Sequence, residues 1–219
     1  MTEHFDPRIV RRTWIFMFAA LALYAWPASF LPRGKNGWLG VAYMYGFNAP
    51  HPAPLLGWIL AALVTALFVA ASMKSYPLIR QHVFDFGAIK LVAIVFAIFS
   101  GTMEELWFRR LLMDYAQRHG AGAVMQVVYS AFFFGAVHAI WGVFARNYRV
   151  ALGSMVATGL LGTALAIVYL ASDRVIAPCI WAHIIINAII EPWLLIAAMT
   201  AGFQRRNSRV AQYPLAQNR

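Results

Sequence analysis

The sequence predicts an all-α protein, a polytopic membrane helix bundle of about six transmembrane helices. Of its 219 residues, 62% are hydrophobic and 12% are charged, and the mean hydropathy is +0.64. This composition is too apolar for a domain whose surface faces water. The charged residues also flank long uncharged stretches, which is typical of a chain that crosses a bilayer several times.

Six uncharged stretches mark the expected spans. They are residues 13–32, 53–73, 91–103, 121–145, 150–172 and 175–200, the last interrupted by Glu191. A bilayer core is crossed by about 20 apolar residues, so five of the stretches are long enough by themselves. The first is longer than the apolar region of a signal peptide, about 7 to 15 residues, and no clear cleavage site follows it. We therefore expect it to be retained as a span.

The third stretch is too short to cross the membrane alone. It has 13 uncharged residues between Lys90 and Glu104, which as a helix cover about 20 Å. The hydrocarbon core is about 30 Å thick. The crossing must therefore include the segment "EELWFR", residues 104–109, and with it two glutamates and an arginine.

The basic residues indicate the orientation. Alternate loops of a six-span chain carry 12 Lys and Arg on the amino-terminal side and 6 on the other. The 12 are Arg8, Arg11, Arg12, Lys74, Arg80, Lys90, Arg146, Arg149, Arg205, Arg206, Arg209 and Arg219; the 6 are Arg33, Lys35, Arg109, Arg110, Arg118 and Arg174. The positive-inside rule then places both termini in the cytoplasm. Because these residues flank spans and form no stripe with interleaved aromatics, they indicate contacts with membrane lipid and no nucleic-acid partner.

Small residues and the single cysteine point to helix packing. The fifth stretch carries several small residues four positions apart, which let a neighbouring helix approach closely. They are Gly153, Ser154, Ala157, Gly159, Gly162 and Ala166. Cys179 has no second cysteine with which to pair, so we expect it to be a small buried hydrophobe.

Three ionisable residues from three expected spans fall at similar depth. With straight helices, Glu104 lies about 21 Å from the cytoplasmic boundary, His138 about 12 Å and His183 about 16 Å. An ionised group in hydrocarbon costs roughly 3 kcal/mol or more, so such residues normally face a protected cavity and indicate function. Glu105 and Arg109 are four positions apart on one helix face, where they can pair and leave little net charge.

These groups suffice for attack of water on a peptide bond. A buried carboxylate can act as a general base, and a histidine can share the proton. A second imidazole and the carboxamide of Asn187, one turn after His183, can donate hydrogen bonds to an oxyanion. The sequence has no "HExxH" or "GxSxG" motif. Three alternatives stay open. The same Glu and His residues could bind zinc in a zinc-dependent membrane protease or relay protons in a proton-coupled transporter, and the chain could be a catalytically silent membrane scaffold.

The three polar segments resemble a known family. "EELWFR", "FGAVH" and "HIIIN" are similar in order and spacing to the motifs EExxxR, FxxxH and HxxxN or HxxxD of the CAAX-processing and bacteriocin-processing (CPBP) family of glutamic intramembrane proteases. The resemblance divides the chain into residues 1–87 with two spans, a protease core at 88–191, and residues 192–219 with the end of the last helix and a basic polar tail.

The resemblance implies the activity and the catalytic residues. It implies an intramembrane endopeptidase, similar to a CAAX prenyl protease, that acts on a membrane-associated or lipid-modified protein or peptide. By motif position, Glu104 and His138 activate the water, and His183 and Asn187 stabilise the oxyanion.

The resemblance also implies the supporting residues and the setting. Arg109 holds Glu105 in a supporting ion pair, and Phe134 is singled out by its motif. No metal or other cofactor is implied. We expect a multi-pass protein of a bacterial plasma membrane.

Overall fold

Six helical segments of the structure are long and apolar enough to cross a membrane. They are Pro7–Arg33, Leu55–Ser75, Ala88–Arg118, Ala123–Ala145, Tyr148–Ala171 and Ala177–Thr200. The structure is a computed structural model that describes residues 7–211, with side chains as far as Thr200. In this part of the chain every regular element is a helix. The predicted fold class and all six predicted spans are therefore confirmed.

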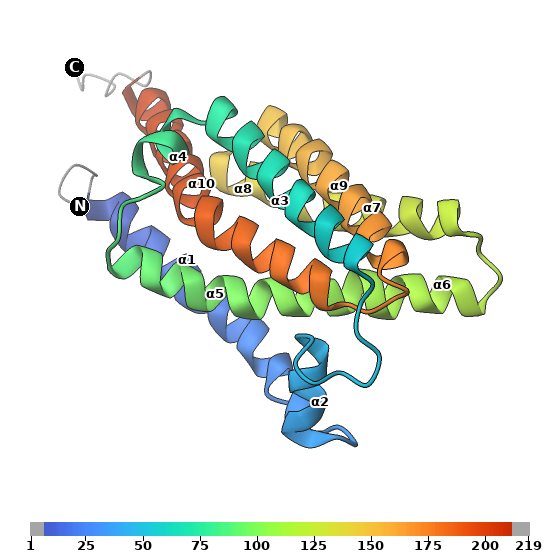
Figure 1. Ribbon diagram of the computed structural model, residues 1–219. Helices are drawn as coiled ribbons and strands as arrows, with labels where there is room; N and C mark the ends of the chain where they lie inside the picture. The colour runs from blue at the N-terminus through green and yellow to red at the C-terminus, as the bar shows by residue number, and fades with distance from the viewer. Residues whose placement is uncertain (1–6, 212–219) are drawn as a thin grey trace, which may run out of the picture.

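The described residues form twelve helical elements. In chain order they are α1 (Pro7–Ala28), η1 (Leu31–Arg33), α2 (Gly37–Met44), α3 (Leu55–Ser75), α4 (Pro77–His82), α5 (Ala88–Glu105), η2 (Leu106–Met113), α6 (Asp114–Arg118), α7 (Ala123–His138), α8 (Trp141–Ala145), α9 (Tyr148–Ala171) and α10 (Ala177–Ala211). All but α2 and α4 belong to the six spans. Figure 1 shows that α1 begins and α10 ends at the same end of the bundle, as an even number of crossings requires.

The third span includes the polar segment, as its length predicts. Helix α5 ends at Glu105, and the chain continues without a break through η2 and α6. Element η2 is a π-helix, a wider turn that occurs frequently at functional sites. Glu104 and Glu105 thus occupy the last positions of the α-helix, directly before the wide turns that carry Arg109.

Three local features differ from the prediction. The expected loop of residues 33–54 contains α2. The fourth span, expected as one straight helix, is interrupted directly after His138, and α8 resumes at Trp141. Helix α10 continues through Pro192 to Ala211, so the predicted polar tail begins with helix.

One basic residue counted for the orientation does not lie in a loop. Arg109, counted with the loops, is fully buried in the third span and so gives no topology signal. Other predictions lie outside the described part of the chain. Residues 1–6 and 212–219, the two ends of the predicted domains, are not described, and they include Arg219. The side chains of Arg205, Arg206 and Arg209 are not described either.

Glycines bring α7 and α9 into close contact. A methyl group on Gly135 would lie 2.6 Å from the carbonyl oxygen of Met155, and one on Gly162 would lie 3.1 Å from the Phe134 ring. The predicted packing role of Gly159 and Gly162 is therefore confirmed. A methyl group on Gly153 would meet nothing within 4 Å, so that part of the predicted packing face is wrong.

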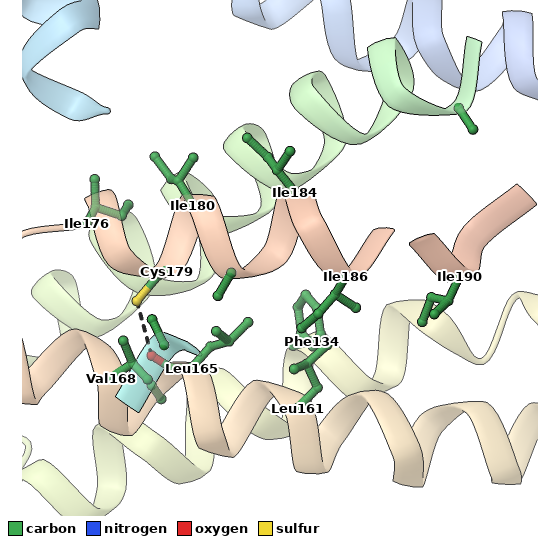
Figure 2. Close-up of a cluster of buried hydrophobic side chains, with 14 of the residues drawn as sticks. Phe134, Leu161, Leu165, Val168, Ile176, Cys179, Ile180, Ile184, Ile186 and Ile190 are labelled. Carbon is green, nitrogen blue, oxygen red and sulfur yellow. Dashed lines mark hydrogen bonds between the residues drawn. The ribbon is translucent and has the colours of Figure 1, made fainter. Parts of the chain in front are cut away.

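The apolar core lies where α10 crosses α9 and α7. Figure 2 shows Ile186 and Ile190 of α10 on the side that faces Leu161, Leu165 and Phe134. Ile176, Ile180 and Ile184 point to the opposite side of the helix. Cys179 is buried in this core, as expected, and its thiol donates to the Leu165 carbonyl at 3.4 Å. This packing fixes the position of the helix that carries His183.

A glycine also lets α5 approach α10 beside the polar residues. A methyl group on Gly101 would lie 3.1 Å from both the backbone nitrogen and Cγ1 of Ile184. Because Gly101 precedes Glu104 by three positions and Ile184 follows His183, this close approach brings the carboxylates within reach of the histidine.

Candidate active site

Glu104 stands at the centre of a cluster of polar side chains. Its side chain is 7% exposed. The Tyr24 hydroxyl, from α1, donates a hydrogen bond of 2.5 Å to Glu104 Oε1. The other oxygen, Oε2, is buried and has no hydrogen-bond partner among the described residues. The two oxygens therefore differ: Oε1 is held by Tyr24, and Oε2 faces the histidines.

His138 and His183 both direct Nε2 towards Glu104 Oε2. The distances are 3.7 Å from His138 and 3.6 Å from His183. These gaps exceed a direct hydrogen bond, so a proton transfer between these atoms requires a small movement or a bridging molecule. Three helices that are far apart in the sequence thus meet at one carboxylate oxygen, as the matched depths predict.

The other ring nitrogen of each histidine is fixed by an acceptor. His138 Nδ1 lies 2.7 Å from the Phe134 carbonyl oxygen, and His183 Nδ1 lies 2.7 Å from Glu105 Oε1. A carbonyl oxygen can only accept, so Nδ1 of His138 carries a proton. In the neutral form its Nε2 is then an acceptor. The tautomer and the orientation of the ring are thus set by groups outside the reaction centre.

Glu105 and Arg109 form the predicted ion pair. Arg109 Nη1 lies 3.0 Å from Glu105 Oε1, and both side chains are fully buried. Arg109 Nη2 also donates to the Gly162 carbonyl at 3.1 Å. A buried pair needs such additional hydrogen bonds to offset its loss of hydration. Because His183 contacts the same oxygen of Glu105, the pair also holds this histidine in place.

Phe134 packs against three of these residues. It is fully buried. Its ring centre lies 4.6 Å from that of His138, 5.5 Å from that of His183 and 4.7 Å from the Arg109 guanidinium carbon. The ring therefore fills the space between both histidines and the arginine, which gives a physical reason for the phenylalanine of the second motif.

Two serines form hydrogen bonds with residues of the second and third motifs. The Asn187 amide donates to Ser100 Oγ at 3.3 Å. Ser154 Oγ donates to the His138 carbonyl at 2.9 Å, at the point where the fourth span is interrupted. From the sequence we predicted that Ser154 belongs to a packing face. In the structure its hydroxyl also forms a hydrogen bond at the break of the fourth span.

A cavity of about 450 Å³ adjoins the cluster. His138, His183, Asn187 and Glu191 contribute polar groups to its wall, and the rest is mainly apolar side chains of α3, α9 and α10. Glu104 is not among the lining residues, so the imidazoles stand between the cavity and its carboxylate. A peptide in this cavity would meet the histidines first.

The described residues contain no group of three or more His, Cys, Asp or Glu side chains arranged to hold a metal ion. The histidines and Glu104 are arranged around one carboxylate oxygen, and their other atoms are bound to Phe134, Glu105 and Tyr24.

All seven residues predicted from the motifs lie in this region, and four further residues join them. Tyr24, Ser100, Ser154 and Glu191 were not predicted as site residues. Glu191 carried a usable signal, because it stands one helical turn after Asn187 on the face that carries the histidine. Tyr24 carried none, because its contact joins residues 80 positions apart.

Comparison with family models gives one match. Residues 86–189, about half of the chain, match the Rce1-like family, described as type II CAAX prenyl endopeptidase Rce1-like. Comparisons with curated proteins and with solved structures found no match. The matched region contains all three motifs and begins and ends close to the predicted core of 88–191. Over this region the chain matches the Rce1-like family of type II CAAX prenyl endopeptidases, which agrees with the CPBP family that the motifs indicate.

Proposed function

We propose that the protein is an intramembrane endopeptidase that hydrolyses a peptide bond of a membrane-associated or lipid-modified protein or peptide. The observation that carries the proposal is the approach of two histidine Nε2 atoms to one buried oxygen of Glu104, beside a cavity within the membrane spans. The family description supports a substrate with a prenylated C-terminal CAAX sequence.

In the proposed mechanism Glu104 and His138 activate water. Because Nδ1 of His138 is engaged by a carbonyl, its Nε2 accepts a hydrogen bond from water in the cavity. The proton is shared with Glu104 Oε2, the free oxygen, while the water oxygen attacks the scissile carbonyl. The proton then passes to the leaving amine, which completes the hydrolysis.

His183 and Asn187 supply the oxyanion contacts. Asn187 has two amide protons, and Ser100 engages one of them, so the other can face the cavity. Donation by His183 Nε2 requires the imidazolium form, because Nδ1 already donates to Glu105. Glu105, Arg109 and Phe134 act by positioning these groups, and Phe134 also lines the cavity.

We further propose that the protein is a multi-pass protein of a bacterial plasma membrane with both termini in the cytoplasm. Its partners in this account are a membrane-associated protein or peptide substrate and membrane lipid. The excess of basic residues on the amino-terminal side supports this orientation.

The test uses the full chain in proteoliposomes with internally quenched peptides that carry a farnesylated or an unmodified cysteine. We compare wild type with Glu104→Ala, His138→Ala and His183→Ala at equal protein levels, with and without a chelator. The exposed loop residue His51 provides the control variant, His51→Ala. We expect wild type and the control to cleave the peptide both with and without chelator. We expect the three site variants to lose cleavage. Loss with chelator would instead indicate a zinc-dependent protease, and unchanged cleavage in the variants would contradict the assignment.

A further inference from the structure

Glu191 brings a carboxyl group to the cavity that the proposed mechanism does not use. It follows Asn187 by four positions and His183 by eight, on one face of α10, and it lines the same cavity. Its Oε2 atom is buried and has no hydrogen-bond partner among the described residues. An ionisable group inside a membrane span is costly unless it is partnered, so such a residue indicates a function.

The nearby basic side chains are engaged elsewhere. Lys90 donates to the Ile189 carbonyl at 3.2 Å and lies 6.0 Å from the Trp193 ring centre. Arg149 also lines the cavity, but it is exposed and its guanidinium contacts the Tyr148 side chain. No ion pair joins either residue to Glu191 in the described part of the chain. The Glu191 carboxyl group therefore has no ion-pair partner in these two side chains.

The remaining wall near Glu191 favours a long side chain with a cationic end. Ile190, Leu194, Ala197 and Leu161 are apolar and can cover a methylene chain. An ionised Glu191 attracts a cation, whereas it would repel a substrate carboxylate.

We propose that Glu191 forms a substrate subsite for a lysine or arginine side chain. This proposal rests on the proposed function, since a substrate subsite requires that the protein binds and cleaves a peptide. Asn187 and Glu191 are about 6 Å apart along the helix axis. An extended peptide advances about 3.3 Å per residue, and its alternate side chains share a face. For a peptide that runs along α10 with its scissile carbonyl at Asn187, the basic residue is the second from the scissile bond.

Direct binding tests the subsite without requiring hydrolysis. The probes are a series of fluorescent farnesylated peptides. Each peptide carries one lysine, or norleucine in its place, at a single position within three residues of the modified cysteine. Their binding to full-length protein with Glu104→Gln is measured in nanodiscs by anisotropy, with and without Glu191→Gln. Norleucine keeps the methylene chain and removes the ammonium, so the pair isolates the charge. Asp85→Asn, an acid outside the cavity, is the control for loss of a negative charge.

We expect the lysine peptide to bind about 10-fold more tightly than its norleucine partner at one position, as for a charge-assisted hydrogen bond. Glu191→Gln should remove this difference and leave the norleucine peptide unchanged, and Asp85→Asn should preserve it. Glu191→Lys should favour a glutamate peptide at the same position. Equal binding of lysine and norleucine peptides at every position would overturn the proposal, as would an equal loss for both with Glu191→Gln. Failure of hydrolysis in wild type would count against the proteolytic function and would leave the binding result to decide the subsite.

Discussion

The Tyr24 hydroxyl donates a hydrogen bond of 2.5 Å to Oε1 of Glu104, and so links a helix outside the family-matched region to the candidate catalytic carboxylate. This contact leaves Oε2 to face the two histidines. A hydrogen bond to a charged group contributes about 1.5 to 3 kcal/mol. Tyr24→Phe should therefore lower kcat by about 10- to 100-fold with little change in KM, measured with the farnesylated peptide.

Tyr45→Phe is the matched control for this change. The Tyr45 hydroxyl forms a hydrogen bond of 2.7 Å with Thr102 Oγ1, also between helices, but it does not reach Glu104. It should leave kcat within about two-fold of wild type, because the Tyr45 hydroxyl touches none of the candidate catalytic groups. Equal losses in both variants would show that Tyr24 acts through stability alone.

The ion pair between Glu105 and Arg109 should be required for a stable fold. Arg109→Met leaves a buried carboxylate without its partner, which typically costs about 3 to 5 kcal/mol. We expect a clear fall in the unfolding temperature of the detergent-solubilised protein. The double variant Glu105→Gln with Arg109→Met should recover part of this loss, because no unpaired charge remains. An unfolding temperature equal to wild type in Arg109→Met would contradict the supporting role.

The contact between α7 and α9 should not accept a larger residue at Gly135. Its added methyl group would meet the Met155 carbonyl oxygen at 2.6 Å, so Gly135→Ala should destabilise the fold by about 1 to 3 kcal/mol. Gly153→Ala is the control, since a methyl group there meets nothing within 4 Å. Thermal unfolding of both variants measures the difference. Similar behaviour of the two would contradict the close packing at Gly135.

The orientation of the chain can be tested with single cysteines. In a Cys179→Ser background, Lys35→Cys and Lys74→Cys place thiols at exposed positions on opposite sides of the bundle. With cytoplasmic termini, a membrane-impermeant maleimide added to intact cells should label position 35, and position 74 should require permeabilisation. The reverse pattern would place both termini outside.

Much of the fold followed from the sequence because a membrane helix must be apolar over its whole length. The six spans and the depth of Glu104, His138 and His183 follow from counting residues at a fixed rise. The break after His138 did not, because neither proline nor glycine follows directly and the turn is fixed by contacts such as that of Ser154. Tyr24 and Ser100 could not be predicted, since their roles depend on how separate helices pack, which the local pattern does not record.

The most direct measurement compares Glu104→Gln with Glu105→Gln for both cleavage of the farnesylated peptide and unfolding temperature. We predict that Glu104→Gln abolishes cleavage and keeps an unfolding temperature close to wild type, because Oε2 of Glu104 is the group that takes the proton from water. We also predict that Glu105→Gln mainly lowers the unfolding temperature, because Arg109 loses its charged partner. Full cleavage by Glu104→Gln together with none by a folded Glu105→Gln protein would contradict the account.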